Sequence, residues 1–267
     1  MMKKISILDI QRLKQEGRKI TMLTAYDVQI ARILDACDVD MILVGDSLGN
    51  VVLGFENTLP VSMDDMVRHT QAVVRGRTRA FVVADMPFMS YQASCEDGLR
   101  NAGRLIKEAG AEAVKVEGGV NAAPVIRAIA QADIPVMAHI GLTPQSVHRM
   151  GGFRVQGREE QQRQKLIADA MAVEEAGAFS VVLECIPSDL AAEITQRISI
   201  PAIGIGAGPD CDGQVLVIND VLGLCGPFRP RFVKQYVQLE DIIRKAVGDY
   251  VDEVRGGMFP GDDHIMK

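Results

Sequence analysis

The chain has 267 residues, 48% hydrophobic and 24% charged, a balance typical of globular proteins, so the composition excludes a disordered chain. The net charge of -6 and the lack of a Lys/Arg cluster exclude the basic surface of a nucleic-acid binder. No apolar run approaches the ~18 residues of a membrane span. The five cysteines have no CxxC spacing, which argues against a zinc ribbon or a disulfide framework. We therefore expect a cytoplasmic protein with reduced thiols whose partners are small molecules.

The first 17 residues predict an amphipathic helix; Asp9, Gln11 and Arg12 interrupt their apolar run, so no signal peptide is expected. Eight apolar runs of strand length follow, with helical segments between most of them: residues 20–27, 41–47, 81–88, 113–119, 135–143, 180–187, 201–208 and 214–220. Continuous runs rich in Val, Ile and Ala are typical of parallel strands covered on both faces.

This alternation, in a chain near the usual barrel length of about 250 residues, predicts an α/β fold: a single-domain (β/α)8 TIM barrel over residues 1–267, with residues 1–17 as an N-terminal helical extension. A doubly wound open sheet is the alternative.

Residues typical of helix caps indicate where several of the expected helices begin or end. Ser62 and Asp65 have capping-box spacing, and Ser188 stands where an N-cap is expected. Gly110 and Gly177 follow helical stretches, as C-terminal caps do. A further set of expectations concerns whole segments: a closing helix at 239–256, no helix between the last two strands, and long loops over the barrel mouth at 48–61 and 144–157.

Several of the apolar runs finish with one polar residue: Asp46, Asp85, Glu117, His139 and Glu184. In a β/α barrel the carboxyl ends of the strands meet at the active site. Lys115 shares a strand face with Glu117, because side chains alternate along a strand. Carboxylates crowded in this way repel one another unless a cation holds them, and Mg2+ prefers oxygen ligands.

The pattern therefore indicates Asp46, Asp85 and Glu117 as magnesium ligands. Lys115 would hold a substrate anion beside them. Glu184 lies on a more distant strand and is free to act as a general base.

Each residue also has a simpler structural interpretation. An aspartate at a strand end can cap a helix, and Lys115 with Glu117 can form a structural ion pair. His139 can be a core histidine, Cys185 packs more naturally against a helix than it serves as a nucleophile, and residues 204–208 lack the spacing of a phosphate-binding loop. Three histidines with no metal-ligand spacing are expected to be peripheral: His69, His148 and His264.

Motifs along essentially the whole chain resemble the ketopantoate hydroxymethyltransferase family. They are "TAYD" at 24–27, "LVGDSLG" at 43–49, "TLPV" at 58–61, "ADMPF" at 84–88, "VKVEGG" at 114–119, "HIGLTPQSV" at 139–147, "VQGR" at 155–158, "LECIP" at 183–187 and "IGIGAGPDCDGQVLV" at 203–217. So many motifs in one order make the resemblance specific. Residues 223–236 match no function that we can assign.

The resemblance implies a (β/α)8 barrel that transfers a hydroxymethyl group from 5,10-methylenetetrahydrofolate to 3-methyl-2-oxobutanoate, giving 2-dehydropantoate in pantothenate biosynthesis. It implies one Mg2+ per subunit and cytoplasmic homodecamers, with no nucleic-acid or membrane partner. Its site residues map onto metal-contacting Asp46, Asp85 and Glu117, keto-acid contacts at Asp46, Ser47, Asp85, Lys115 and His139, and a proton acceptor at Glu184.

Two rival interpretations remain. A magnesium-dependent, enolate-forming barrel of the phosphoenolpyruvate mutase and isocitrate lyase type would share the architecture, but the cysteine-containing catalytic loop of that type is absent from this sequence. A barrel that has lost catalysis would have no use for an acidic mouth, because crowded carboxylates are costly to bury.

Overall fold

The computed structural model describes residues 3–150, 152, 154–224 and 230–266. The chain divides into two compact units, Met1–Val217 and Ile218–Lys267. All eight strands and the predicted site residues belong to the first unit. The assignment of residues 1–267 to a single domain stays a prediction.

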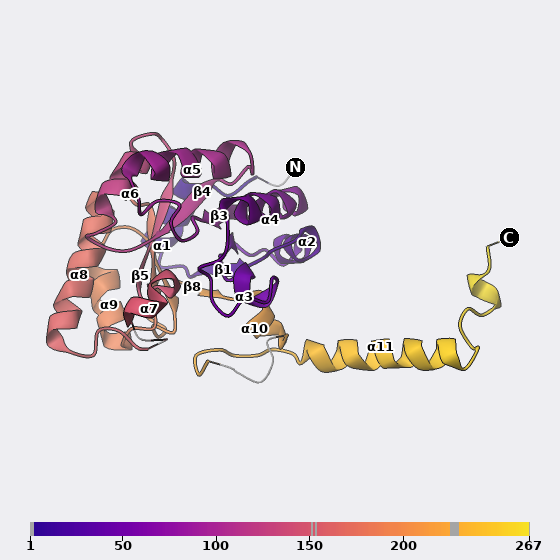
Figure 1. Cartoon of the computed structure of the whole chain (residues 1–267). Helices are drawn as coiled ribbons and strands as arrows, with labels where there is room; N and C mark the ends of the chain where they lie inside the picture. Colours follow the sequence, from indigo (N-terminus) through magenta and orange to yellow (C-terminus); the bar gives the residue numbers. More distant parts are fainter. Residues whose placement is uncertain (1–2, 151, 153, 225–229, 267) are drawn as a thin grey trace. The chain divides into compact units, whose positions relative to one another are not determined.

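The first unit is a closed barrel of eight parallel strands in the order β1 to β8, and β8 pairs with β1 to close it (Figure 1). The strands are β1 Ile20–Thr24, β2 Met41–Val44, β3 Phe81–Asp85, β4 Ala113–Glu117, β5 Val136–Gly141, β6 Ser180–Glu184, β7 Ala202–Ile205 and β8 Gly213–Leu216. The barrel prediction is confirmed. Its apolar runs form strands because helices outside and packed side chains inside remove both faces from water.

Helices connect most of the strands and surround the barrel (Figure 1). They are α2 Val28–Ala36, α3 Leu48–Val51, α4 Met63–Gly76, α5 Cys95–Lys107, α6 Ala123–Ala130, α7 Val147–Met150, α8 Glu160–Glu175 and α9 Ser188–Arg197, with the 3-10 turn η1 Pro144–Ser146. Within the described residues no helix joins β7 to β8, as the short spacing predicts. The short α3 and α7 differ from the expectation of continuous loops at 48–61 and 144–157.

The capping predictions have mixed outcomes. The Ser62 hydroxyl accepts a hydrogen bond from the backbone N–H of Asp65, and the Asp65 carboxylate accepts one from the backbone N–H of Ser62, so the capping box at the start of α4 is confirmed. Ser188 is not an N-cap: it is the first residue of α9, the N-cap position is Pro187, and no side chain caps that end. Gly110 and Gly177 adopt positive φ angles of 79° and 96°, the left-handed conformation of a C-terminal cap.

The helix α1, Ile7–Gln15, confirms the predicted N-terminal extension. Its Ile10 and Leu13 pack into the barrel core, together with residues from the beginnings of the strands. The ammonium of Lys14 donates to the Asp212 carboxylate at 2.9 Å and to two backbone carbonyl groups. α1 therefore covers the amino-terminal end of the barrel and leaves the carboxyl end for the site.

Inside the barrel, an apolar layer is followed by a polar one. The apolar core includes Val83 on β3, Ala113 on β4, Met137 on β5 and Val182 on β6. Because side chains on one strand face recur every two residues, the next inward positions are those of Asp85, Lys115, His139 and Glu184. The two-residue period therefore delivers four polar side chains to one end of a dry core.

The second unit contains α10 Ile218–Leu222, α11 Leu239–Arg255 and the 3-10 turn η2 Asp262–His264. The closing helix predicted at 239–256 is confirmed, whereas α10 was not expected. α11 carries exposed apolar side chains at intervals of four, three and four residues: Ile243, Val247, Tyr250 and Val254. Part of the segment 223–236, including Cys225, lies outside the described residues.

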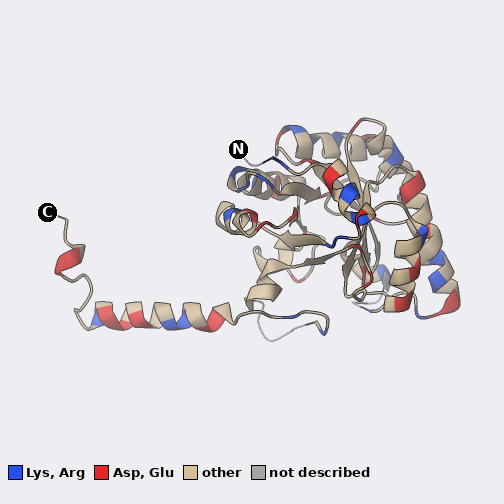
Figure 2. Cartoon of the chain, turned by 180° about the vertical axis from the view of Figure 1, so that it is seen from behind, with Lys and Arg blue, Asp and Glu red and all other residues tan. Residues whose placement is uncertain are grey.

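Acidic and basic residues are mixed along outer helices such as α8 and α11, without a broad basic stretch (Figure 2). In the portion of the chain that the structure describes, no helix combines the length and apolarity needed to cross a membrane. Cys37, Cys95, Cys185 and Cys211 are free thiols, as predicted.

Candidate active site at the carboxyl end of the barrel

Strand register brings the central charged residues into neighbouring pairs. Asp85 on β3 is in register with Lys115 on β4, and Glu117 on β4 is in register with His139 on β5. All four are at most 7% exposed. The predicted convergence of these residues is confirmed, because four side chains from three adjacent strands meet at one buried location.

Lys115 lies between two partners. Its Nζ is 3.0 Å from Asp85 Oδ1 and 3.2 Å from His139 Nδ1. Lys115 does not pair with Glu117 on its own strand, contrary to the structural ion pair considered from the sequence. The ammonium is thus held against the carboxylate of the preceding strand.

His139 lies between two carboxylates. Its Nδ1 is 3.3 Å from Glu117 Oε1, and its Nε2 is 3.0 Å from Glu184 Oε2. Glu184 is on β6, with a side chain 15% exposed, so it lies nearer to solvent than the others. His139 Nε2 makes no hydrogen bond of good geometry, so the imidazole pairs with Glu184 through charge and proximity, and it is not an isolated core histidine.

Asp46 and Ser47 lie in the turn after β2. The backbone N–H of Asp46 donates to Asp85 Oδ2 at 2.9 Å, which ties this turn to β3. The Ser47 hydroxyl is 2.8 Å from the Tyr26 hydroxyl, and Ser47 occupies the N-cap position of α3 without a side-chain cap bond. Both residues are therefore placed at the mouth by backbone geometry, and the Asp46 side chain caps no helix.

The electrostatics of the group show that the carboxylates are in excess. Burial, followed by the charges of Asp85 and Glu117, raises the pKa of Asp46 to about 8. Burial also raises the pKa of Asp85, in spite of the Lys115 ammonium beside it. Asp46 and Asp85 therefore resist ionising together in the absence of a further cation.

The two basic side chains of the site, Lys115 and His139, are stabilised in their charged forms. Burial opposes the charged form of Lys115, but the charges of Asp85, Glu117 and Asp46 outweigh it and raise its pKa. Burial and the Lys115 charge oppose the imidazolium of His139, yet the adjacent carboxylates of Glu117 and Glu184 raise its pKa to about 9. With all four carboxyl groups ionised, these two cations would leave two negative charges, which one bound divalent ion would balance.

The donor chemistry of this group suits magnesium. Asp85 Oδ1 is buried and, among the described residues, accepts no hydrogen bond, although the Lys115 ammonium is near. Where the chain is described, no group of three or more His, Cys, Asp or Glu side chains is arranged so that it could hold a metal ion by itself. Mg2+ needs no such cage, because it binds through one or two carboxylates and completes its shell with water and substrate oxygens.

Gln145 in η1 is a site residue that the sequence reasoning missed. Its side-chain amide donates to Asp46 Oδ2 at 2.9 Å, and its backbone N–H donates to Glu117 Oε2 at 3.0 Å. The Tyr91 hydroxyl donates to the Gln145 carbonyl oxygen at 2.8 Å. The available signal was the position of Gln145 in the motif "HIGLTPQSV", directly after the strand that carries His139.

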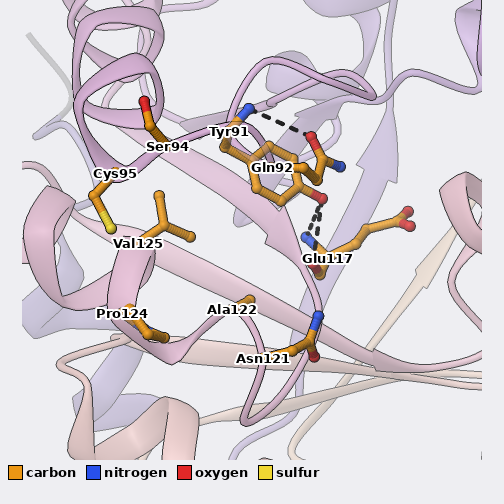
Figure 3. A pocket seen from close by; sticks show the side chains of 9 residues that line it. All are labelled: Tyr91, Gln92, Ser94, Cys95, Glu117, Asn121, Ala122, Pro124 and Val125. Atoms are coloured by element: carbon orange, nitrogen blue, oxygen red, sulfur yellow. Dashed lines mark hydrogen bonds between the residues drawn. The ribbon is translucent and has the colours of Figure 1, made fainter.

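A cavity of about 240 Å3 adjoins the site on the outer side of β4. It is lined by Tyr91, Gln92, Ser94, Cys95, Glu117, Asn121, Ala122, Pro124 and Val125. Figure 3 shows the Glu117 carboxylate pointing away from Cys95, Pro124 and Val125. Glu117 therefore lines the cavity mainly through its backbone, and its carboxylate belongs to the group described above.

The other candidate residues lie outside this group. Cys185 is half-buried, and burial followed by the Glu184 charge raises the pKa of its thiol to about 12, so it is not a nucleophile at neutral pH. His148 and His264 are exposed, as expected of peripheral residues. His69 Nδ1 lies 2.6 Å from the Tyr26 carbonyl oxygen.

The family model for ketopantoate hydroxymethyltransferase matches residues 4–262. The chain is 63% identical over 267 residues to the 3-methyl-2-oxobutanoate hydroxymethyltransferase of Geotalea daltonii, covering 100% of both chains. It is 60% identical over 267 residues to the enzyme of that name from Citrifermentans bemidjiense, again with complete coverage of both.

The solved structure of 2,3-dimethylmalate lyase, a phosphoenolpyruvate mutase/isocitrate lyase superfamily member, matches with a TM-score of 0.62 at 16% identity, covering 97% of this chain and 91% of that one. At 16% identity the likeness shows a shared fold alone. It therefore gives no further support to the interpretation of the chain as a phosphoenolpyruvate mutase or isocitrate lyase type of enzyme. The family model and the full-length relatives agree on the other interpretation, and the chain belongs to the ketopantoate hydroxymethyltransferase family.

Proposed function

We propose that this chain transfers a hydroxymethyl group from 5,10-methylenetetrahydrofolate to 3-methyl-2-oxobutanoate, which gives 2-dehydropantoate. The observation that carries the proposal is the meeting of Asp46, Asp85, Lys115, Glu117 and His139 at the carboxyl end of the barrel, with Glu184 at its edge. A small anionic keto acid suits such a site, because an ammonium and a cation bound by carboxylates both attract it. The relatives named above bear the name of this activity.

Asp46, Asp85 and Glu117 would hold one Mg2+ per subunit. Two observations support this assignment: the crowding that raises the pKa of Asp46, and Asp85 Oδ1, which accepts no hydrogen bond and has the Lys115 ammonium 3.0 Å away. When bound, the ion stabilises the negative charge that develops on the carbonyl oxygen of the keto acid as a proton leaves the neighbouring carbon.

Lys115 would bind the keto acid electrostatically. Its pKa is raised, so it carries its positive charge throughout the neutral range. Lys115 is 5% exposed, and its ammonium can contact a carboxylate or enolate oxygen with little competition from water. The Ser47 hydroxyl and the carboxylates of Asp46 and Asp85 would complete the contacts to the keto acid.

Glu184 would take the proton from C3 of the keto acid. His139 Nε2 lies 3.0 Å from one of its carboxylate oxygens, Oε2, and the other would accept the proton. C3 forms the new carbon–carbon bond to the methylene carbon of the folate, and both carbon–nitrogen bonds of the methylene bridge break. One water supplies the hydroxyl oxygen and the protons for the two nitrogen atoms, the proton held by Glu184 goes to the hydroxyl oxygen, and tetrahydrofolate leaves. His139 contributes by orienting Glu184 and by facing the bound keto acid.

We also propose a cytoplasmic homo-oligomer, a decamer if the family resemblance extends to assembly. The exposed apolar row Ile243, Val247, Tyr250 and Val254 on α11 supports association between copies, because its spacing is that of a helix that packs against another. Multi-angle light scattering that gave a mass of 29.0 kDa, the mass of one chain, would contradict the oligomer.

The proposed activity is tested by incubating the protein with Mg2+, 3-methyl-2-oxobutanoate and 5,10-methylenetetrahydrofolate and following the products by mass spectrometry. We expect 2-dehydropantoate to form in proportion to protein concentration. Lack of product at high protein concentration, with both substrates intact, would overturn the proposal.

A further inference from the structure

Gln145 is almost fully buried although it lies outside the strands and long helices. It belongs to the three-residue turn η1, four residues beyond Gly141 at the end of β5, and is only 6% exposed. Burying an amide side chain costs free energy unless its donors and acceptor are satisfied. The partners of Gln145 therefore indicate why a polar residue occupies this position.

The polar atoms of Gln145 are fully satisfied. The side-chain nitrogen donates to Asp46 Oδ2 and to the Met86 carbonyl oxygen, both at 2.9 Å. The side-chain oxygen accepts from the Tyr91 hydroxyl at 2.8 Å and from the Gln92 amide at 3.1 Å. A glutamate would lack both donors, and an asparagine would be one methylene too short to reach the same partners.

The bonds from Gln145 act on two carboxylates from different segments. Asp46, in the turn after β2, receives the side-chain amide on Oδ2, and Glu117, on β4, receives the backbone N–H on Oε2. Each bond occupies one oxygen, so the rotation of both carboxylate groups is restricted and the direction of each remaining oxygen is set. The remaining oxygen of Glu117, Oε1, is directed toward His139.

The neutrality of the amide is a second significant property. A lysine or arginine at position 145 would also orient the carboxylates, but its charge would cancel part of the negative charge that attracts a cation. A glutamine donates hydrogen bonds and leaves that charge unchanged. Partners of this kind, behind the ligands of a metal, commonly change metal affinity by 10–100-fold when they are removed.

We propose that Gln145 is a positioning residue, which fixes the orientations of the Asp46 and Glu117 carboxylates around the site of the divalent cation and the keto acid. This inference rests on the proposed metal-dependent function. It adds a residue from the β5–α8 connection to a site otherwise built from strand ends and the turn after β2. Tyr91 and Gln92, which follow β3, hold the carbonyl end of Gln145 and so set the direction of its amide.

The test replaces Gln145 with methionine, which has nearly the same length but no hydrogen-bonding groups. Mn2+ alone serves as the probe, because it binds carboxylate oxygens as Mg2+ does and can be followed by electron paramagnetic resonance. We expect the Kd for Mn2+ to rise about 10–100-fold in the Q145M protein. The KM for the keto acid should rise in the same variant.

Gln156→Met is the matched control. It makes the same chemical change in the same connection between β5 and α8, at a side chain that donates to the Arg154 carbonyl oxygen and contacts none of the carboxylates named above. Its Kd for Mn2+ should equal that of the wild type. Should Q145M fail to fold, as judged by circular dichroism, the polar Gln145→Asn variant is measured instead, with the same expectation.

The outcomes separate the inference from the proposed function. A folded Q145M or Q145N protein with wild-type Mn2+ affinity and wild-type KM would overturn the role of Gln145, while leaving the proposed function intact. A wild-type protein that binds no Mn2+ would contradict the metal-dependent function itself, and the inference with it. Weakened Mn2+ binding confined to the Gln145 variants would support both.

Discussion

Replacing Lys115 with methionine removes the buried ammonium of the site and keeps most of its aliphatic volume. In the wild type Nζ lies 3.0 Å from Asp85 Oδ1 and 3.2 Å from His139 Nδ1, in surroundings that exclude water. The variant leaves Asp85 without that cation, beside Asp46 and Glu117. We expect the folded state of the metal-free protein to lose a large part of its stability.

The expected magnitude follows from two arguments. Breaking a buried ion pair by removing one partner costs about 3–5 kcal/mol, because a charge is left buried and uncompensated. The variant can limit this cost by protonating Asp85: for a carboxyl with an unfolded pKa near 4, protonation at pH 7 costs about 4 kcal/mol, at about 1.4 kcal/mol per pH unit. Both arguments give a loss of about 4 kcal/mol.

The assay is urea unfolding of the metal-free proteins at pH 7, followed by circular dichroism. Lys107→Met is the control, since it makes the same change at an exposed position of α5 and should leave the unfolding midpoint unchanged. A loss below about 1 kcal/mol for the Lys115 variant is what an exposed ion pair gives. That result would refute the argument that Lys115 balances a buried carboxylate group.

Two further predictions concern the fold and the cation. Asp35 accepts hydrogen bonds from Thr78 and from the backbone N–H of Ala80, so Asp35→Asn should cost about 3 kcal/mol in urea unfolding at pH 7. Burial alone would raise the pKa of Asp35, but these hydrogen bonds lower it. The ionised Asp35 carboxylate thus stabilises the folded state fully above its unfolded pKa, which is near 4, and this stabilisation is lost as the pH falls through the lower pKa of the folded state. If the difference in unfolding free energy between the wild type and Asp35→Asn grew in acid, the reasoning would be contradicted. Removing divalent cations with EDTA should lower the midpoint of thermal unfolding, because Asp46, Asp85 and Glu117 then repel one another; a midpoint indifferent to EDTA and Mg2+ would count against the metal site.

The sequence predicts most of the fold and much of the site because both depend on a two-residue period. Once Val83 and Ala113 are assigned to the apolar core, Asp85 and Lys115 follow at the next inward positions, and parallel register makes them neighbours. The eight apolar runs, separated mostly by helical segments, likewise predict eight parallel strands and therefore the barrel.

Features that depend on nonlocal contacts were not predictable. The five hydrogen bonds of Gln145 join segments up to 99 residues apart in the chain, and no local pattern indicates them. Pairing of Lys115 with Asp85 rather than with Glu117 is likewise set by the distance between adjacent strands.

The absence of a Ser188 cap has a local cause: Pro187 occupies the N-cap position, which places Ser188 inside the helix.

The assignment of Glu184 as the base is the central claim about chemistry, and hydrogen exchange at C3 of the keto acid tests it most directly. The protein is incubated in D2O with Mg2+ and 3-methyl-2-oxobutanoate, without folate, and the loss of the C3 proton signal is followed by NMR. We expect the wild type to exchange this proton, and Glu184→Gln, which keeps the shape of the side chain, to bind the keto acid but lose the exchange. Exchange at the wild-type rate in the Glu184→Gln protein would contradict the account.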